Sequence, residues 1–291
     1  MEVFILGSSC AIPTVERNLP SVAIRHLGKI YLFDCGEGTQ REMLKNNLNI
    51  AKVKAIFISH MHADHFIGVG GLIRTLALTT SGFEIKIFSP FPMLIKNFLS
   101  FAQASTNIEI KKIKEGKVFE EKDFEVFAFK LKHTISAYGF VFKEKDKIKF
   151  KKEKANKLGI KGKMFKELLE KRSIKVGNKT IKLEEVSYVK KGKKIAYVAD
   201  TSFLPKIVDF VKDSDLLIHE ATYSKNEEEL AKKRKHSTAE DAAKIAKLAR
   251  VKKLLLFHIS NRYRDPKILE KEARKIFKNS FLAYDGMKIE I

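Results

Sequence analysis

The sequence predicts an α/β protein with mixed sheets, and three observations support this class. Short apolar runs that end in Gly, Asp, Ser or His recur along the 291 residues, as in buried strands. Stretches with helical periodicity lie between them. A short connection, Leu27-Gly28-Lys29, joins the runs 22–25 and 30–33 as a hairpin, which predicts antiparallel strands beside parallel ones.

The predicted elements follow the chain in order. The expected strands are residues 3–6, 30–33, 55–58, 85–88, 124–131, 195–198, 215–218 and 254–257. The expected helices are residues 39–48, 66–78, 205–211, 238–248 and 266–277, with Ser237 as the N-cap of the fourth. His26 falls in the hairpin turn, so we expect it at the surface.

Composition excludes several classes of protein. A hydrophobic fraction of 44% is too high for a disordered chain. The only cysteines, Cys10 and Cys35, exclude a disulfide framework and an all-cysteine zinc site. No apolar run approaches the roughly 18 residues of a membrane span, and no basic leader precedes the first apolar run. The sequence therefore predicts a cytoplasmic protein with no membrane partner.

Positive charge is concentrated in one segment. The chain has 57 Lys+Arg against 35 Asp+Glu, a net charge of +22. A lysine-rich proteome alone could produce this total, since only 10 of the 57 are Arg. However, residues 143–194 hold 20 Lys+Arg and 7 Asp+Glu, a local excess that a uniform bias does not explain. We expect a single domain over 1–291 with a basic arm inserted at 143–194. In this arm, lysines 143, 145, 147, 149 and 151 are expected to alternate along one strand edge, and a helix is expected over 164–171. The alternative is a solvated hairpin of no specific role.

The strongest motif follows the predicted strand 55–58. It reads Ser59-His60-Met61-His62-Ala63-Asp64-His65, with four ligand-type side chains within six residues. Neutral imidazoles clustered with a carboxylate are what a divalent metal such as zinc prefers. Because these residues offer more ligands than one tetrahedral ion needs, we expect two metal ions.

Further ligand-type residues follow other predicted strands. They are His133, Asp200, His219 and His258. The carboxyl ends of strands in an α/β sheet converge on a crevice, so we expect one edge of the sheet to collect these side chains. We assign His133, Asp200 and His258 to the metal site and leave His219 as either a structural residue or one that contacts the metal ligands without binding metal.

These motifs resemble the metallo-β-lactamase superfamily, whose hallmark His-x-His-x-Asp-His is matched by His60, His62, Asp64 and His65. Further local motifs are similar to the ribonuclease Z family of tRNA 3′-processing endonucleases: residues 33–40, Ala199-Asp200-Thr201, 219–222, His236-Ser237-Thr238 and 258–263. The resemblance implies an αββα sandwich. It also implies that His60, His62 and His133 hold one zinc ion, that Asp64, His65 and His258 hold a second, and that Asp200 bridges them.

The resemblance implies catalytic roles as well. His236 would protonate the leaving ribose oxygen, Glu220 would orient His236, and Asp64 would also accept a proton from the attacking water. The substrate would be precursor tRNA and the enzyme a homodimer, with the basic arm gripping tRNA through its lysines. Arg17, Asn18, Arg262, Lys161 and Lys163 are the candidate RNA contacts.

Two departures from the family pattern concern these contacts. Val15 stands where the family's Pro-x-Lys-x-Arg-Asn loop has Lys, which bears on discrimination against CCA-bearing tRNA. The arm has Gly159-Ile160-Lys161-Gly162-Lys163 without the family's Gly-Pro pattern. Two other functions stay open at this point: a phosphodiesterase of the superfamily acting on small substrates such as cyclic nucleotides, and a non-catalytic basic RNA-binding protein.

Overall fold

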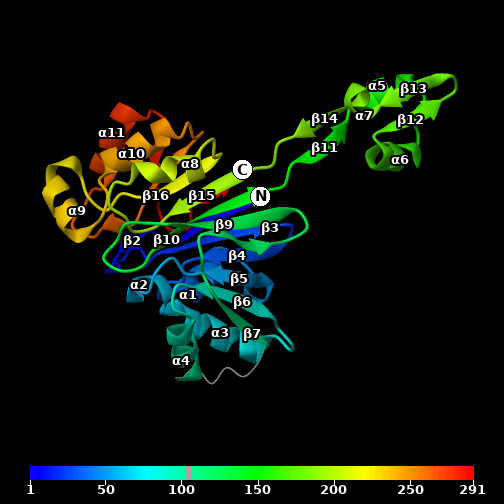
Figure 1. The fold of residues 1–291 in the computed structure, drawn as a ribbon. Helices are drawn as coiled ribbons and strands as arrows, with labels where there is room; N and C mark the ends of the chain where they lie inside the picture. The colour runs from blue at the N-terminus through cyan, green and yellow to red at the C-terminus, as the bar shows by residue number, and fades with distance from the viewer. Residues whose placement is uncertain (102–106) are drawn as a thin grey trace. The chain divides into compact units, whose positions relative to one another are not determined.

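The computed structural model describes residues 1–101 and 107–291, which form two compact units (Figure 1). The first unit comprises Met1–Lys143 and Lys194–Ile291, and the second comprises Glu144–Lys193.

The first unit contains two seven-stranded sheets. The first sheet has the order β20-β1-β3-β4-β5-β6-β7. Its strands are β1 (Glu2–Gly7), β3 (Ser21–His26), β4 (Lys29–Phe33), β5 (Val53–Phe57), β6 (Ile85–Ser89), β7 (Ile108–Lys112) and β20 (Lys288–Glu290). β1, β3 and β20 pair antiparallel, whereas β4 to β7 pair parallel, so the sheet is mixed as predicted.

The second sheet has the order β19-β17-β16-β15-β10-β9-β8. Its strands are β8 (Gly116–Glu120), β9 (Phe124–Lys130), β10 (Tyr138–Glu144), β15 (Lys194–Val198), β16 (Leu216–Glu220), β17 (Leu254–Phe257) and β19 (Ser280–Leu282). β15, β16, β17 and β19 run parallel. β2 (Ser9–Cys10) and β18 (Ile259–Ser260) form a short parallel pair, and β18 directly follows His258 in the chain.

Three apolar clusters define four layers. One cluster lies between the sheets and joins Phe33 and Phe57 to Phe140 and Tyr197. A second packs the first sheet against α1 (Thr39–Lys45), α3 (Gly68–Thr79) and α4 (Pro92–Phe101). A third packs the second sheet against α8 (Val208–Val211), α10 (Ala239–Leu248) and α11 (Lys267–Ile276). Helices therefore cover the outer faces of two packed sheets, the predicted αββα sandwich (Figure 1).

The second unit has its own small core. β11 (Lys147–Phe150) pairs antiparallel with β14 (Ser187–Lys190), and β12 (Ser173–Val176) pairs with β13 (Lys179–Lys182). Three short helices accompany them: α5 (Lys152–Lys157), α6 (Met164–Lys171) and α7 (Leu183–Val186). The buried apolar residues of this unit pack on one another, with Leu168, Ile174 and Val186 among them.

Several sequence expectations need correction. His26 is buried because β3 extends to it, and its ring packs edge-on against Phe124 and Phe142. The predicted helix 66–78 is two helices, α2 (Ala63–Phe66) and α3. Residues 205–211 form a 3₁₀ turn, Pro205–Ile207, followed by α8.

Three more corrections concern caps and sheet edges. Thr238, not Ser237, caps α10, since its hydroxyl accepts from the Asp241 amide. Lys143 and Lys151 do not share one strand, because β10 ends at Glu144 and β11 spans only Lys147–Phe150. The site residues follow strands of both sheets rather than one edge of a single sheet.

Candidate metal centre

The His60–His65 segment leaves the end of β5 and is fixed by backbone hydrogen bonds. The Ile58 amide donates to the Phe88 carbonyl at 2.8 Å, and the Tyr138 amide donates to the Ser59 carbonyl at 3.0 Å. The segment ends in α2, where Gly68 follows closely. A Cβ at Gly68 would lie 1.9 Å from the carbonyl oxygen of Gly36, so only glycine allows this close packing of backbones.

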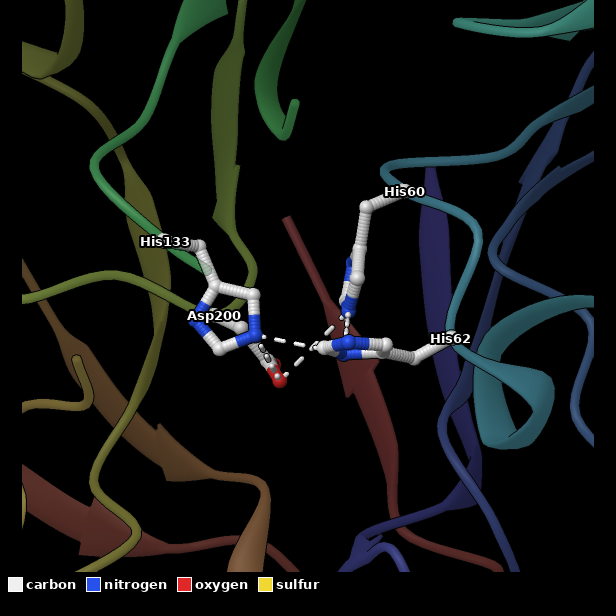
Figure 2. Close-up of side chains that lie close together, drawn as sticks. All are labelled: His60, His62, His133 and Asp200. Carbon is white, nitrogen blue, oxygen red and sulfur yellow. Dashed lines mark hydrogen bonds and ion pairs between the residues drawn. The ribbon is translucent and has the colours of Figure 1, made fainter. Parts of the chain in front are cut away.

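One group of ligand atoms gathers around Oδ2 of Asp200 (Figure 2). His60 Nε2 lies 3.6 Å and His133 Nε2 lies 3.7 Å from this oxygen. His62 Nδ1 lies 3.1 Å from His60 Nε2 and 3.2 Å from His133 Nε2. The four side chains come from loops after β5, β9 and β15, so both sheets contribute to the group.

A second group gathers around Oδ1 of the same aspartate. His65 Nε2 lies 3.4 Å and His258 Nε2 lies 3.3 Å from Asp200 Oδ1. Asp64 Oδ2 lies 3.6 Å from each of these nitrogens. The two oxygens of Asp200 therefore face two separate groups of donors.

The donor set fits divalent metal ions. The ligand atoms of His60, His62, His133 and Asp200 lie within 4.8 Å of one another, and so do those of Asp64, His65 and His258. Oδ1 of Asp200 is buried without a hydrogen-bond partner among the described residues, which is costly for a carboxylate unless a cation faces it. Burial holds the pKa of His60 well below its usual range, and a neutral imidazole is the form that binds metal.

The orientations of the imidazole rings are fixed by hydrogen-bond partners on Nδ1, the ring nitrogen that does not face Asp200. Such partners set which nitrogen of an imidazole faces a metal. They hold four of the imidazoles as follows: Ser59 Oγ lies 2.9 Å from His60 Nδ1, Asp34 Oδ2 lies 2.7 Å from His65 Nδ1, His133 Nδ1 lies 3.0 Å from the Lys235 carbonyl oxygen, and Thr222 Oγ1 lies 3.0 Å from His258 Nδ1. Each of these rings thus presents Nε2 to Asp200.

Two family models match the chain. Residues 1–174 match the model described as anti-Pycsar protein Apyc1, and residues 176–259 match the β-lactamase superfamily domain. Among solved structures, human tRNase Z, short form, is 28% identical with a TM-score of 0.71, and the alignment covers 100% of this chain and 99% of that one. The metallo-β-lactamase fold protein YhfI of Bacillus subtilis, at 19% identity, TM-score 0.73 and 99% coverage of both chains, shares the fold.

Full-length relatives are more informative about the family. Ribonuclease Z of Archaeoglobus fulgidus is 37% identical, over 100% of this chain and 97% of the relative. Ribonuclease Z of Methanothermobacter thermautotrophicus is 35% identical with the same coverage. The chain belongs to the ribonuclease Z family. This membership confirms two predictions, the metallo-β-lactamase fold and a metal-dependent endoribonuclease.

His236 borders the metal groups and is held by Glu220. His236 Nδ1 lies 3.0 Å from Glu220 Oε1 and 4.0 Å from Asp200 Oδ2. Burial alone would lower the pKa of His236, but the carboxylates of Glu220 and Asp200 raise it above its usual value. Glu220 is fully buried and also accepts hydrogen bonds from the amides of Thr201 and Thr222. His236 is thus kept in a fixed orientation that favours its protonated form.

The sequence-predicted RNA contacts lie in different surroundings. Arg17 donates to Ser8 Oγ at 2.8 Å and to the Ala283 carbonyl at 2.9 Å. Arg262 pairs with Glu227 at 2.5 Å and stacks over Tyr223. Asn18, Lys161 and Lys163 complete the set; Asn18 packs against Gly38, whereas both lysines are exposed in the second unit. His219 is buried, its Nδ1 donates to the Glu220 carbonyl at 2.7 Å, and it belongs to neither metal group among the described residues.

Two residues that matter to the site were not singled out from the sequence. Asp34 holds His65, and Thr222 holds His258 while also donating to Glu220 Oε2 at 2.8 Å. Both lie inside motifs that resembled the family, the segments 33–40 and 219–222. The available signal was their position in the sequence: Asp34 directly follows the predicted strand 30–33, and Thr222 comes four residues after the predicted strand 215–218.

Among the helices of the described residues, none is long and apolar enough to cross a membrane.

Proposed function

We propose that this chain removes the 3′ trailer from precursor tRNA by cutting after the discriminator nucleotide. The products would be a tRNA with a 3′-hydroxyl and a trailer with a 5′-phosphate. One observation carries the proposal: histidines of two ligand groups, most of whose members are buried, approach the two oxygens of Asp200 in a chain that is a full-length relative of ribonuclease Z proteins. The similar human structure is named a tRNase Z, which supports tRNA as the substrate.

The proposed metals are two zinc ions per subunit. His60, His62 and His133 would hold one ion, Asp64, His65 and His258 the other, and Asp200 both, which agrees with the two donor groups around its oxygens. Zinc ions bound there would activate water for attack on the phosphodiester and offset its negative charge.

The chain's own residues then handle the protons. As water attacks phosphorus, the bond from phosphorus to the ribose 3′-oxygen breaks, and this oxygen is a poor leaving group unless it is protonated. His236 is the proposed donor, and Glu220 positions it through Nδ1. Asp64 is the proposed acceptor of the proton from water, and its Oδ2 is fixed by the Ala11 amide at 3.0 Å.

The second unit is the proposed tRNA-binding surface. Residues 144–193 carry 18 Lys+Arg and 7 Asp+Glu, so their contacts would be with phosphates and would not select sequence. Lys161 and Lys163 of this unit, with Arg17, Asn18 and Arg262 of the first, remain the proposed RNA contacts. The proposal also includes a homodimer and a cytoplasmic location.

The deciding experiment uses a 3′-extended precursor tRNA that lacks encoded CCA. The purified protein should cut just after the discriminator and leave a 3′-hydroxyl, and a chelator should abolish the cut. The Asp64→Ala variant should lose cleavage while it retains tRNA binding. Hydrolysis of a small phosphodiester without any cut in the tRNA would instead place the protein among small-substrate phosphodiesterases.

A further inference from the structure

A second pocket adjoins the metal pocket through His236. The metal pocket is lined by Asp64, His133, Asp200 and His258 as well as His236. The second pocket, about 500 Å³, has His236 in its wall together with Phe203 and four lysines. Those lysines are Lys132, Lys232, Lys235 and Lys244. We call this space the Phe203 pocket.

Phe203 is an exposed aromatic residue on a firmly held loop. Its side chain is 39% exposed, which is unusual for phenylalanine in a chain whose apolar clusters bury most other rings. The loop is fixed because the Ser202 amide donates to the Lys132 carbonyl at 2.9 Å and the Thr201 amide donates to Glu220 Oε1 at 2.8 Å. The carboxylate of Glu220 therefore holds both this loop and His236.

Two of the four lysines have no ion-pair partner among the described residues. Lys232 pairs with Glu228 and Glu229, and Lys244 pairs with Asp241. Within the described residues, Lys132 and Lys235 have no ion-pair partner. In the described parts of the chain the Lys235 ammonium donates only to the His133 carbonyl, at 3.4 Å. The Phe203 pocket thus combines an exposed aromatic ring with two positive charges that lack a counterion.

We propose that the Phe203 pocket binds the nucleotide on the 5′ side of the cut bond, with its base stacked on Phe203 and its phosphate against Lys132 and Lys235. This inference rests on the proposed function. A general acid must touch the leaving oxygen, and that 3′-oxygen belongs to the nucleotide on the 5′ side of the cut. Because His236 lines both pockets, a nucleotide whose 3′-oxygen contacts His236 lies next to the Phe203 pocket.

The chemistry of the pocket suits a nucleotide whose identity varies. A phenyl ring stacks on every base, since each base has a π-face, and lysines contact phosphate without reading sequence. Among the described residues that line the Phe203 pocket, the only polar side chains besides the lysines and His236 are Ser202, Glu228 and Asp241, and both carboxylates already pair with lysines. The pocket therefore holds a nucleotide by stacking and charge rather than by base-specific hydrogen bonds.

The test combines variants at Phe203 with precursor tRNAs that carry an abasic nucleotide on either side of the cut. Phe203→Ala should lower kcat/KM on intact precursor about 10-fold, the scale of one lost base stack, and Phe203→Trp should restore it. Leu248→Ala is the matched control, because Leu248 is also an exposed apolar side chain but lies at the far end of α10. Thermal unfolding of each variant confirms that it is folded.

The abasic substrates identify which nucleotide occupies the pocket. Removing the base on the 5′ side should slow the wild type about 10-fold and slow Phe203→Ala no further, because the stack is already lost. Removing the base on the 3′ side should slow both proteins equally. Coupling of Phe203 to the 3′-side base, or no effect of Phe203→Ala on a precursor that the wild type cuts, would overturn the inference alone. No cleavage of precursor by the wild type would refute the proposed function instead.

The lysines are tested through salt dependence. The Lys132→Gln/Lys235→Gln variant should weaken precursor binding and reduce the slope of log affinity against log salt by about 0.7 for each lost phosphate contact. Lys247→Gln/Lys271→Gln, which changes two exposed lysines outside the Phe203 pocket, should leave the slope unchanged. An equal change in both double variants would show that only net charge matters and would overturn the assignment of Lys132 and Lys235.

Discussion

Asp34 Oδ2 lies 2.7 Å from Nδ1 of His65, and both side chains are fully buried. The same carboxylate accepts hydrogen bonds from the Ser59 amide at 2.7 Å and from the Tyr197 hydroxyl at 2.7 Å. It therefore connects β4, the His60–His65 segment and β15, which belong to different sheets. Asp34 fixes the ring of His65 so that Nε2 faces Asp200.

Asp34→Asn should weaken metal binding in the group formed by Asp64, His65 and His258. Asn has one acceptor oxygen in place of two, so it cannot accept from both the Ser59 amide and His65. Loss of the partner on His65 typically costs 10- to 100-fold in metal affinity. Zinc titration with a competing chelator measures this affinity. Tyr197→Phe removes another donor to the same carboxylate but leaves His65 bonded, so it should bind zinc nearly as well as the wild type. Equal affinities of both variants would refute the role of Asp34.

Removing a single ligand should abolish the binding of one metal ion and leave the other bound. His62→Ala should lose the ion shared with His60 and His133, whereas His258→Ala should lose the other. Mass spectrometry under native conditions should therefore find two zinc ions per wild-type chain and one in each variant. Retention of two ions by either variant would show that the proposed division of ligands is wrong.

His236→Ala should slow the cleavage of a substrate with a poor leaving group much more than that of a substrate with a good one. A ribose 3′-oxygen needs a proton, so cleavage of precursor tRNA should fall about 10² to 10⁴-fold, while hydrolysis of bis(p-nitrophenyl) phosphate, whose leaving group is stable as an anion, should fall far less. Steady-state kinetics on both substrates provide the comparison. Equal losses on the two substrates would mean that His236 supports the site without donating a proton.

The sequence predicts several of the proposed metal ligands because they stand at or just after the end of an apolar strand. His60, Asp200 and His258 all follow such runs, and a strand end fixes the position of the next side chain. The orienting residues could not be assigned in the same way. Thr222 acts on His258 across 36 residues of sequence, and no local pattern encodes that distance.

The errors in the predicted fold also arise because local sequence patterns do not encode contacts between distant parts of the chain. His26 stands beside a Gly-containing turn, which is ordinarily exposed, yet it is 5% exposed because Phe124 and Phe142 of the other sheet cover it. Its Nε2 also pairs with Asp123. The edge strand β7 was missed because Glu109, Lys111 and Lys112 interrupt its apolar pattern, as is common where a strand faces solvent.

Acid should weaken the antiparallel edge of the first sheet. Glu2 lies opposite Arg25 across β1 and β3 and also pairs with Lys288 of β20, and hydrogen bonds from Arg25 and Lys288 lower its pKa from 4.5 to about 2. A lowered pKa means that the pair stabilises the fold fully above pH 4.5 and less as pH falls toward 2.

Glu2→Gln measures this contribution. At pH 7 the variant should be less stable by about 1 kcal/mol, as for a partly exposed ion pair, and the difference should shrink with added salt and below pH 4.5. Urea unfolding at several pH values is the measurement. Glu290→Gln is the control, since Glu290 is 80% exposed and lies 3.5 Å from Lys288. A difference that persists unchanged below pH 4.5 would contradict the assigned pairing.

Deleting the second unit should abolish tRNA processing but spare small phosphodiesters. Lys143 and Lys194 are directly paired across β10 and β15, so a two-residue Asn-Gly turn can replace residues 144–193 without altering that register. The apolar core of the deleted unit is separate from the three clusters that hold the two sheets, and the metal ligands all lie in the remaining unit. Processing should fall because the phosphate contacts are lost, whereas bis(p-nitrophenyl) phosphate should still be hydrolysed. A deletion variant that still processes precursor tRNA at the wild-type kcat/KM would reduce the basic unit to a solvated surface.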